Sequence, residues 1–152
     1  MRKLGLKLGL SGEATQIVTE QETAAKLGSG LVDAYSTPSL VSLMENASVA
    51  AIEGFMSDGQ TTVGVEVSVR HLAPTPVGMH VKALAVLEGI RGNRLKFKVE
   101  AWDEKERIGE GLHTRVIIDI PRFSRRLQEK ASAVHNRPNG GAKGYSNVHK
   151  RL

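Results

Sequence analysis

One carboxylate in this chain lies where both a structural and a chemical role have to be considered. Glu45 falls in the stretch YSTPSLVSLMENA, and its neighbours at helical spacing include Val41 and Val49. In one interpretation the acid reaches past the core and pairs with an arginine or a backbone amide. In the other it lies in a cleft where desolvation adjusts its pKa for nucleophilic or general-base work.

A histidine provides the second candidate group. His71 ends the strand-like pattern in VSVRHLAPTP, just before a proline-containing loop. Loops held by a rigid scaffold often carry reactive side chains, although a surface or hydrogen-bonded histidine is the simpler alternative. The other histidines are not clustered with it at metal-ligand spacing, so no metal site is predicted. These are His80, His113, His135 and His149. His113 could face the cleft or the outer surface of a sheet, and the outer surface is favoured.

The elements that would position these groups follow from local patterns. Thr37 suits a helix N-cap and Pro38 suits the first helical position, so a helix is predicted from Thr37 to about residue 54. After the Asp58-Gly59 turn the apolar period changes to two, which predicts strands. The expected strands span residues 61–72, 80–90, 94–104 and 107–120, with a weaker one at 12–19 and an amphipathic helix at 121–134.

The order of these elements predicts an α+β fold. Consecutive strands with short connections pair antiparallel, and a helix that is apolar on nearly all sides must be enclosed. We therefore expect an antiparallel sheet wrapped around one long central helix. The free edges of such a sheet favour a homodimer, and whether dimers pair into tetramers stays open. The folded domain is predicted to span residues 1–132, with a basic, disordered tail at 133–152.

Composition narrows the classes of protein that remain. The chain has 152 residues and no cysteine, which excludes disulfides, thiol nucleophiles and zinc-thiolate sites and favours a cytoplasmic enzyme. No apolar run is long enough to cross a bilayer, so no membrane partner is predicted. The net charge of +5 comes from residues 121–152, which hold eight Lys/Arg and one acid. That segment has no nucleic-acid-binding motif, so nucleic acid is not expected as a partner, although a phosphate-attracting arm is the alternative.

The candidate residues also form a recognisable ordered set. Thr37, Glu45 eight residues later, Gly64 within a strand and His71 before APTPVG resemble the hotdog-fold thioesterases of the fluoroacetyl-CoA thioesterase-like branch. The segments SLVSLMENASVAAI, TTVGVEVSVRHLAPTPVG and IGEGLHTRVII support this resemblance, which covers roughly residues 30–127. It implies a hotdog fold and hydrolysis of acyl-CoA thioesters in a cleft between two subunits.

The resemblance also implies roles for individual residues. Thr37, Glu45 and His71 would be the catalytic set, with Glu45 as nucleophile or general base and His71 as proton shuttle. The substrate-binding residues would be Gly64 and Leu31 at the acyl group and Arg70, among several arginines, at the CoA phosphates. No cofactor is expected beyond the coenzyme A of the substrate.

Two features limit what the resemblance implies. The fluoroacetate-specific members carry aromatic gate residues where this chain has Leu31 and Gly28, so a small or medium acyl group is expected without fluoroacetyl specificity. Eight helical residues rise about 12 Å, so Thr37 and Glu45 meet in one site only through a partner chain, a water or a non-helical Thr37. A non-catalytic acyl-CoA or acyl-metabolite binding protein is the alternative function, and a hotdog dehydratase is less favoured.

Overall fold

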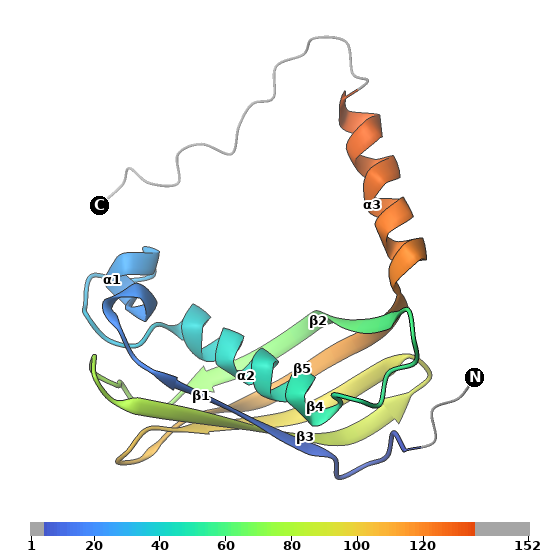
Figure 1. The fold of residues 1–152 in the computed structure, drawn as a ribbon. Coiled ribbons are helices and arrows are strands. Elements are labelled where there is room, and N and C mark those ends of the chain that lie inside the picture. Colours follow the sequence, from blue (N-terminus) through green and yellow to red (C-terminus); the bar gives the residue numbers. More distant parts are fainter. Residues whose placement is uncertain (1–4, 136–152) are drawn as a thin grey trace. The chain divides into compact units, whose positions relative to one another are not determined.

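The computed structural model describes residues 5–135, and its contacts divide the chain into two units, Met1–Asp119 and Ile120–Leu152. The first unit contains five strands and three helical segments (Figure 1). In chain order these are β1 (Ser11–Ile17), the 3-10 helix η1 (Glu20–Glu22), α1 (Ala24–Leu27), α2 (Thr37–Ala51), β2 (Gln60–His71), β3 (His80–Arg91), β4 (Arg94–Trp102) and β5 (Arg107–Asp119). The second unit contains α3 (Ile120–His135). The predicted domain boundary at 132/133 stays a prediction, and residues 136–152 of the predicted tail lie outside the described part.

The five strands form one antiparallel sheet in the order β1-β3-β4-β5-β2. The sheet curves around α2, which lies along its concave face (Figure 1). This confirms the predicted α+β fold with a central helix, and also the weak strand at 12–19, which pairs with β3 as β1. The edges of the sheet are β1 and β2.

Strict alternation in β3 and β4 supplies the inner face of the sheet. Four residues of each strand point towards α2 and are almost completely buried: Val81, Ala83, Ala85 and Leu87 of β3, and Leu95, Phe97, Val99 and Ala101 of β4. Burial of an aliphatic or aromatic side chain stabilises a fold by about 1.5–3 kcal/mol. The alanines in these two rows are small enough to leave room for the helix, and the longer side chains pack beside it.

Helix α2 buries a broad apolar face against this layer. Leu40, Met44 and Ala47 are completely buried, and the helix ends at Ala51, three residues before its predicted end. The N-cap is Ser36, whose side chain accepts a hydrogen bond from the Ser39 N–H, so the prediction of Thr37 as N-cap was wrong by one position. Both residues are good capping types, and Pro38 is tolerated at the second position as well as the first because neither N–H has a partner within the helix.

Strand β2 combines a free edge with an irregularity in its pairing to β5. The register shifts between Gly64 and Glu66, which makes Val65 the extra residue of a β-bulge. Val65 and Val67 are 49% and 42% exposed, although valine is a residue that strands normally bury. A twelve-residue edge strand with exposed valines is a ready template for pairing with another chain.

Helix α3 confirms the amphipathic helix predicted at 121–134. Its apolar residues recur at helical spacing and none of its side chains is buried. Within residues 5–135, no helix is both long and apolar enough to cross a bilayer.

Candidate active site

Two of the three predicted catalytic residues are in direct contact. Thr37 is the first residue of α2 and His71 is the last residue of β2, and the Thr37 Oγ1 atom lies 2.9 Å from the His71 Nδ1 atom. They meet because α2 begins above the point where β2 ends. Thr37 is exposed, so the pair lies at the surface of the single chain.

The other ring nitrogen of His71 is unusual. His71 Nε2 is buried and has no hydrogen-bond partner among the described residues. Burial lowers the pKa of His71, so the neutral imidazole predominates at pH 7. An unpartnered buried donor or acceptor costs about 1–3 kcal/mol, and such groups are found where a ligand or a catalytic step uses them.

The third predicted residue, Glu45, belongs to a different cluster. No hydrogen bond or ion pair of residues 5–135 joins it to Thr37 or His71. Its Oε2 atom accepts a hydrogen bond from Arg115 Nη1 at 3.3 Å, and its side chain is 41% exposed. The structural interpretation of Glu45, pairing with an arginine, is therefore what the single chain shows. Because Thr37 is helical, a partner chain or a water is the remaining way to bring Thr37 and Glu45 into one site.

Arg115 is held tightly from several directions. Its Nε donates to Thr62 Oγ1 at 2.9 Å and its Nη2 donates to the Thr62 carbonyl at 3.0 Å. Burial lowers the pKa of the guanidinium, and the charge of Glu45 opposes that shift. The ordinary pKa of an arginine lies so far above neutrality that Arg115 remains a cation at neutral pH. The donors of Arg115 therefore serve the protein itself and are not available to the CoA phosphates.

His113 completes the surroundings of Arg115. Its Nδ1 lies 2.8 Å from the carbonyl of Glu66, and its Nε2 lies 3.1 Å from Arg115 Nη1. A carbonyl only accepts and a guanidinium only donates, so His113 carries its proton on Nδ1 and is neutral. The 3.9 Å approach of His113 Nε2 to Glu45 is therefore not an ion pair. His113 is 2% exposed, and the prediction that it lies on the outer surface of the sheet was wrong.

The inward orientation of His113 and Arg115 was not predicted, because polar residues in a strand usually face solvent. The period of two in β5 does contain the missing signal. It puts His113, Arg115 and Ile117 on one face of the strand, and Ile117 packs against the hydrophobic core.

Gly64 lies at the centre of the Glu45–Arg115–His113 cluster, the name used below for these three side chains. A Cβ atom at Gly64 would lie 2.9 Å from Glu45 Oε2, 3.0 Å from His113 Cε1 and 3.3 Å from Arg115 Nη1. Only a residue without a side chain leaves these atoms undisturbed. The expected role of Gly64 at the acyl group stays a prediction.

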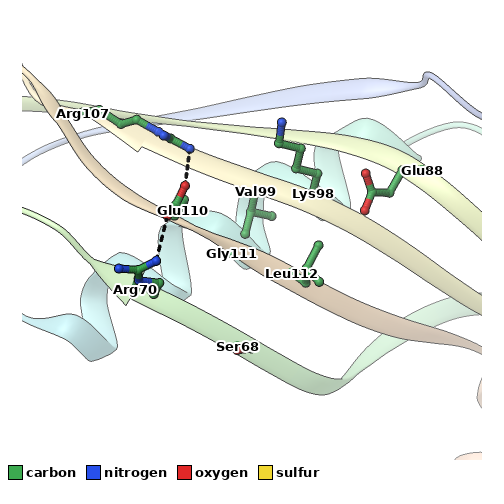
Figure 2. Close-up of a pocket in the computed structure, with 9 residues that line it drawn as sticks. All are labelled: Ser68, Arg70, Glu88, Lys98, Val99, Arg107, Glu110, Gly111 and Leu112. Atoms are coloured by element: carbon green, nitrogen blue, oxygen red, sulfur yellow. Dashed lines mark hydrogen bonds and ion pairs between the residues drawn. The ribbon is translucent and has the colours of Figure 1, made fainter.

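The remaining two predicted residues lie elsewhere. Leu31 is in the loop between α1 and α2 and is 84% exposed. Arg70 lies on the sheet face opposite α2, where Glu110 stands between it and Arg107 (Figure 2). Glu110 forms ion pairs with Arg70 at 3.6 Å and with Arg107 at 2.7 Å. These three residues help to line a surface hollow with a volume of about 490 Å³. The substrate-binding roles of Leu31 and Arg70 stay predictions.

Metal-ligating side chains do not gather anywhere in residues 5–135: no group of three or more His, Asp or Glu could hold an ion there. Between them, the Thr37–His71 pair and the Glu45–Arg115–His113 cluster offer acid–base groups, a fixed cation and an unpartnered imidazole nitrogen. These suit nucleophilic or water-mediated attack on a polarised carbonyl.

Comparison with known families decides the class of protein. The model of the fluoroacetyl-CoA-specific thioesterase family, FlK, matches residues 18–120. The chain belongs to the FlK thioesterase family. It is thus a thioester hydrolase, as predicted, and not the alternative of a non-catalytic binding protein.

Individual relatives of this FlK-family protein support the same family assignment. The fluoroacetyl-CoA thioesterase of Streptantibioticus cattleyicolor is 34% identical over 101 residues, which are 66% of this chain and 73% of the relative. A crystal structure of the fluoroacetyl-CoA thioesterase FlK superposes with a TM-score of 0.78 at 29% identity, over 83% of this chain and 98% of that one. A thioesterase superfamily member from Thermus thermophilus gives 0.77 at 32% identity, over 86% and 98%. The hotdog fold is thereby confirmed.

Proposed function

We propose that this FlK-family protein hydrolyses the thioester of a small or medium acyl-CoA, with Glu45 as nucleophile or general base and His71 as proton shuttle. The main support for the proposal is the hydrogen bonding and exposure of the Glu45 carboxylate. Arg115 holds one of its oxygens, while Oε1 has no hydrogen bond among the described residues and the side chain is 41% exposed. A fixed carboxylate with one free oxygen is suited to attack a carbonyl or to orient a water.

Both routes to hydrolysis balance with the groups present. In the first, Glu45 attacks the thioester carbonyl, the C–S bond breaks, and CoA leaves as a thiolate. Neutral His71 then takes a proton from the water that cleaves the acyl-enzyme anhydride and passes this proton to the thiolate. In the second, Glu45 takes a proton from a water that attacks the carbonyl directly, the C–S bond breaks, and the proton passes through His71 to the departing CoA thiolate. Either way the charge on the carbonyl oxygen grows, and N–H groups near Gly64 or the start of α2 are the donors available to stabilise it.

His71 and Thr37 have the chemistry of a proton-transfer pair. The imidazole is neutral at pH 7, and its Nε2 has no protein partner. The Thr37 hydroxyl, 2.9 Å from Nδ1, fixes the orientation of the ring. Hydrogen-bonded positioning of a histidine by a second group is a recurring feature of general acid–base catalysis.

A site with all three residues needs a second copy of the chain, and β2 provides the edge. We propose an antiparallel pairing of the two β2 strands in which His71 of one copy lies opposite Gly64 of the other. The exposed Val65 and Val67 then become interior positions of a continuous sheet. Each Thr37–His71 pair would face the Glu45–Arg115–His113 cluster of the partner.

Mixed dimers test this arrangement directly. Glu45→Gln and His71→Ala each remove hydrolysis when present alone, measured by thiol release from acyl-CoA. If Glu45 and His71 of different copies form one site, mixing the two variants after unfolding and refolding restores about a quarter of wild-type sites, since half of the dimers are mixed and one of their two sites is intact. A mixture that stays inactive, or an active Glu45→Gln protein, contradicts the proposal.

Substrate size is tested with a series of acyl-CoA esters. We expect acetyl-CoA to butyryl-CoA to be hydrolysed, with no strong preference for fluoroacetyl-CoA, because Leu31 supplies no aromatic ring at the acyl group. Replacing Arg70 by Met is expected to raise the KM for acyl-CoA with little effect on kcat if it contacts the CoA phosphates. The predicted cytoplasmic location stays a prediction.

A further inference from the structure

Helix α3 carries an apolar stripe that its own unit leaves exposed. The stripe consists of Ile120, Phe123, Leu127 and Val134, at spacings of three, four and seven residues. Leu127 and Val134 are 55% and 59% exposed. A narrow stripe with this spacing is typical of a helix that packs against one protein partner, whereas a helix lying on a membrane usually has a wider apolar face.

The rest of α3 is strongly basic. The helix carries four cations and one acid, Glu129. Off the stripe lie Arg122, Arg125 and Arg126, while Lys130, seven residues after Phe123, lies at the border of the stripe. A partner of α3 is therefore expected to combine an apolar surface with nearby acidic residues.

The body of the chain has such a surface, here called the apolar patch and defined as Leu31, Val32 and Val77. These side chains are 84%, 63% and 43% exposed. The two segments that carry them are joined by the bridge between Ala34 and Pro76. Residues 20–33, next to the patch, contain three acids and one base, namely Glu20, Glu22, Asp33 and Lys26.

The proposed pairing of β2 strands brings the start of α3 to the partner's patch. Ile120 directly follows Asp119, which pairs with Gln60 at the beginning of β2. With His71 opposite the partner's Gly64, the antiparallel register carries Gln60 just past the end of the partner's β2, to the level of its residues 72–77. A 16-residue helix is about 24 Å long, enough to cross from there to the loop at Leu31.

We infer that α3 is an interaction surface for a second copy of this chain, and that its apolar stripe packs against the partner's apolar patch. The inference rests on the β2 dimer of the proposed function and adds a second contact to it. Burial of the stripe and patch removes the largest exposed aliphatic side chains of both surfaces from water. The basic face of α3 then lies beside the acidic segment 20–33.

Cross-linking tests the contact, because the chain has no cysteine of its own. Two single-cysteine proteins, Val32→Cys and Leu127→Cys, are mixed, allowed to exchange subunits, and treated with a short bismaleimide. We expect a covalent dimer that contains one chain of each type, identified by mass after labelling one chain with ¹⁵N. The matched control is Ser132→Cys, which lies on the same helix but off the stripe, and its yield with Val32→Cys should be several-fold lower.

Three results would overturn the inference. They are equal yields for Leu127→Cys and Ser132→Cys, no cross-link in a protein that sedimentation shows to be dimeric, and a Val32→Cys/Leu127→Cys double variant that cross-links only within one chain. A monomer by sedimentation also overturns it, together with the proposed composite site. Cross-linking needs no turnover, so loss of the hydrolase proposal and loss of the α3 contact are separate outcomes.

A substitution pair supplies an independent measurement. Leu127→Asp is expected to raise the dissociation constant of the dimer at least about tenfold, because it places a charge in the contact. Ser132→Asp makes the same change of charge on the same helix and is expected to leave the constant within about twofold. Equal effects of the two substitutions would contradict a contact through the stripe.

Discussion

Replacing Gly64 by Ala tests the candidate site through a single added methyl group. The new Cβ would lie 2.9 Å from Glu45 Oε2 and 3.0 Å from His113 Cε1, whereas heavy atoms in contact prefer about 3.5–4.0 Å. The buried His113 is held by the Glu66 carbonyl and by Arg115, so the half-exposed Glu45 is the group that moves. A shift of about 0.5 Å, which restores that spacing, would stretch its 3.3 Å hydrogen bond to Arg115 beyond a useful length.

The expected consequence is a loss of rate with a smaller loss of stability. Misplacement of a reacting group by about 1 Å costs up to about 100-fold in rate, so a shift of half that size predicts a kcat roughly 10-fold lower. Glu45 is partly solvated and can move, but the 3.0 Å contact with the held ring of His113 remains, so we expect the unfolding free energy to fall by about 1–2 kcal/mol. The assay is thiol release from acyl-CoA, with thermal unfolding measured in parallel.

A matched glycine provides the control. A Cβ at Gly89, which lies at the other register shift of the sheet, would meet only the Lys96 side chain, at 3.3 Å and 4.0 Å. Gly89→Ala is therefore expected to retain the wild-type kcat. If Gly64→Ala hydrolyses acyl-CoA at the wild-type rate while remaining folded, the Glu45–Arg115–His113 cluster does not hold the reacting carboxylate.

Three further substitutions and conditions follow from the same contacts. Thr37→Val removes the hydroxyl that orients His71 and is expected to lower kcat about 5- to 10-fold without changing the unfolding midpoint by more than about 2 °C, measured by steady-state kinetics and calorimetry. Because burial lowers the pKa of His71, the unfolded chain binds this proton more readily, so stability falls as the pH drops below about 6.5. His71→Gln should flatten that part of a plot of unfolding midpoint against pH, and an unchanged slope would assign the effect to another group. His113→Leu leaves a donor of Arg115 and the Glu66 carbonyl without their partner, so it is expected to lower the unfolding free energy by about 2–4 kcal/mol in urea titrations.

The sheet and its central helix were predictable because they depend on local patterns. The period of two in residues 80–90 and 94–104 reappears as the fully buried rows of β3 and β4. The helix start was predicted to within one residue, and the error between Ser36 and Thr37 arose because adjacent hydroxyl residues are equally good caps. Such signals act over a few residues and can be read from the chain alone.

The surroundings of Glu45 depend on pairing between distant segments. Arg115 is 70 residues away in the sequence, and it reaches Glu45 only because β5 lies next to β2 below the helix. One of the two interpretations of Glu45 paired it with an arginine or a backbone amide, but local sequence patterns do not distinguish among the arginines. Facing direction was the missing information: the alternation of β5 turns Arg115 inwards, while that of β2 turns Arg70 outwards.

The single extra residue at Val65 has a consequence for how this strand can change its length. Side chains on either side of the bulge keep to the inner face only because one residue is left out of the count between Gly64 and Glu66. Deleting Val65 would therefore leave Gly64 opposite Arg115 and Glu66 opposite Thr114, and the rest of β2 would keep its partners on β5. Thr62 would still accept hydrogen bonds from Arg115. Deleting Val63 instead would shift Thr62 by one position and turn its side chain away from the guanidinium. Loss of one residue from this edge is therefore expected to be tolerated at the bulge and damaging on the side that holds Arg115.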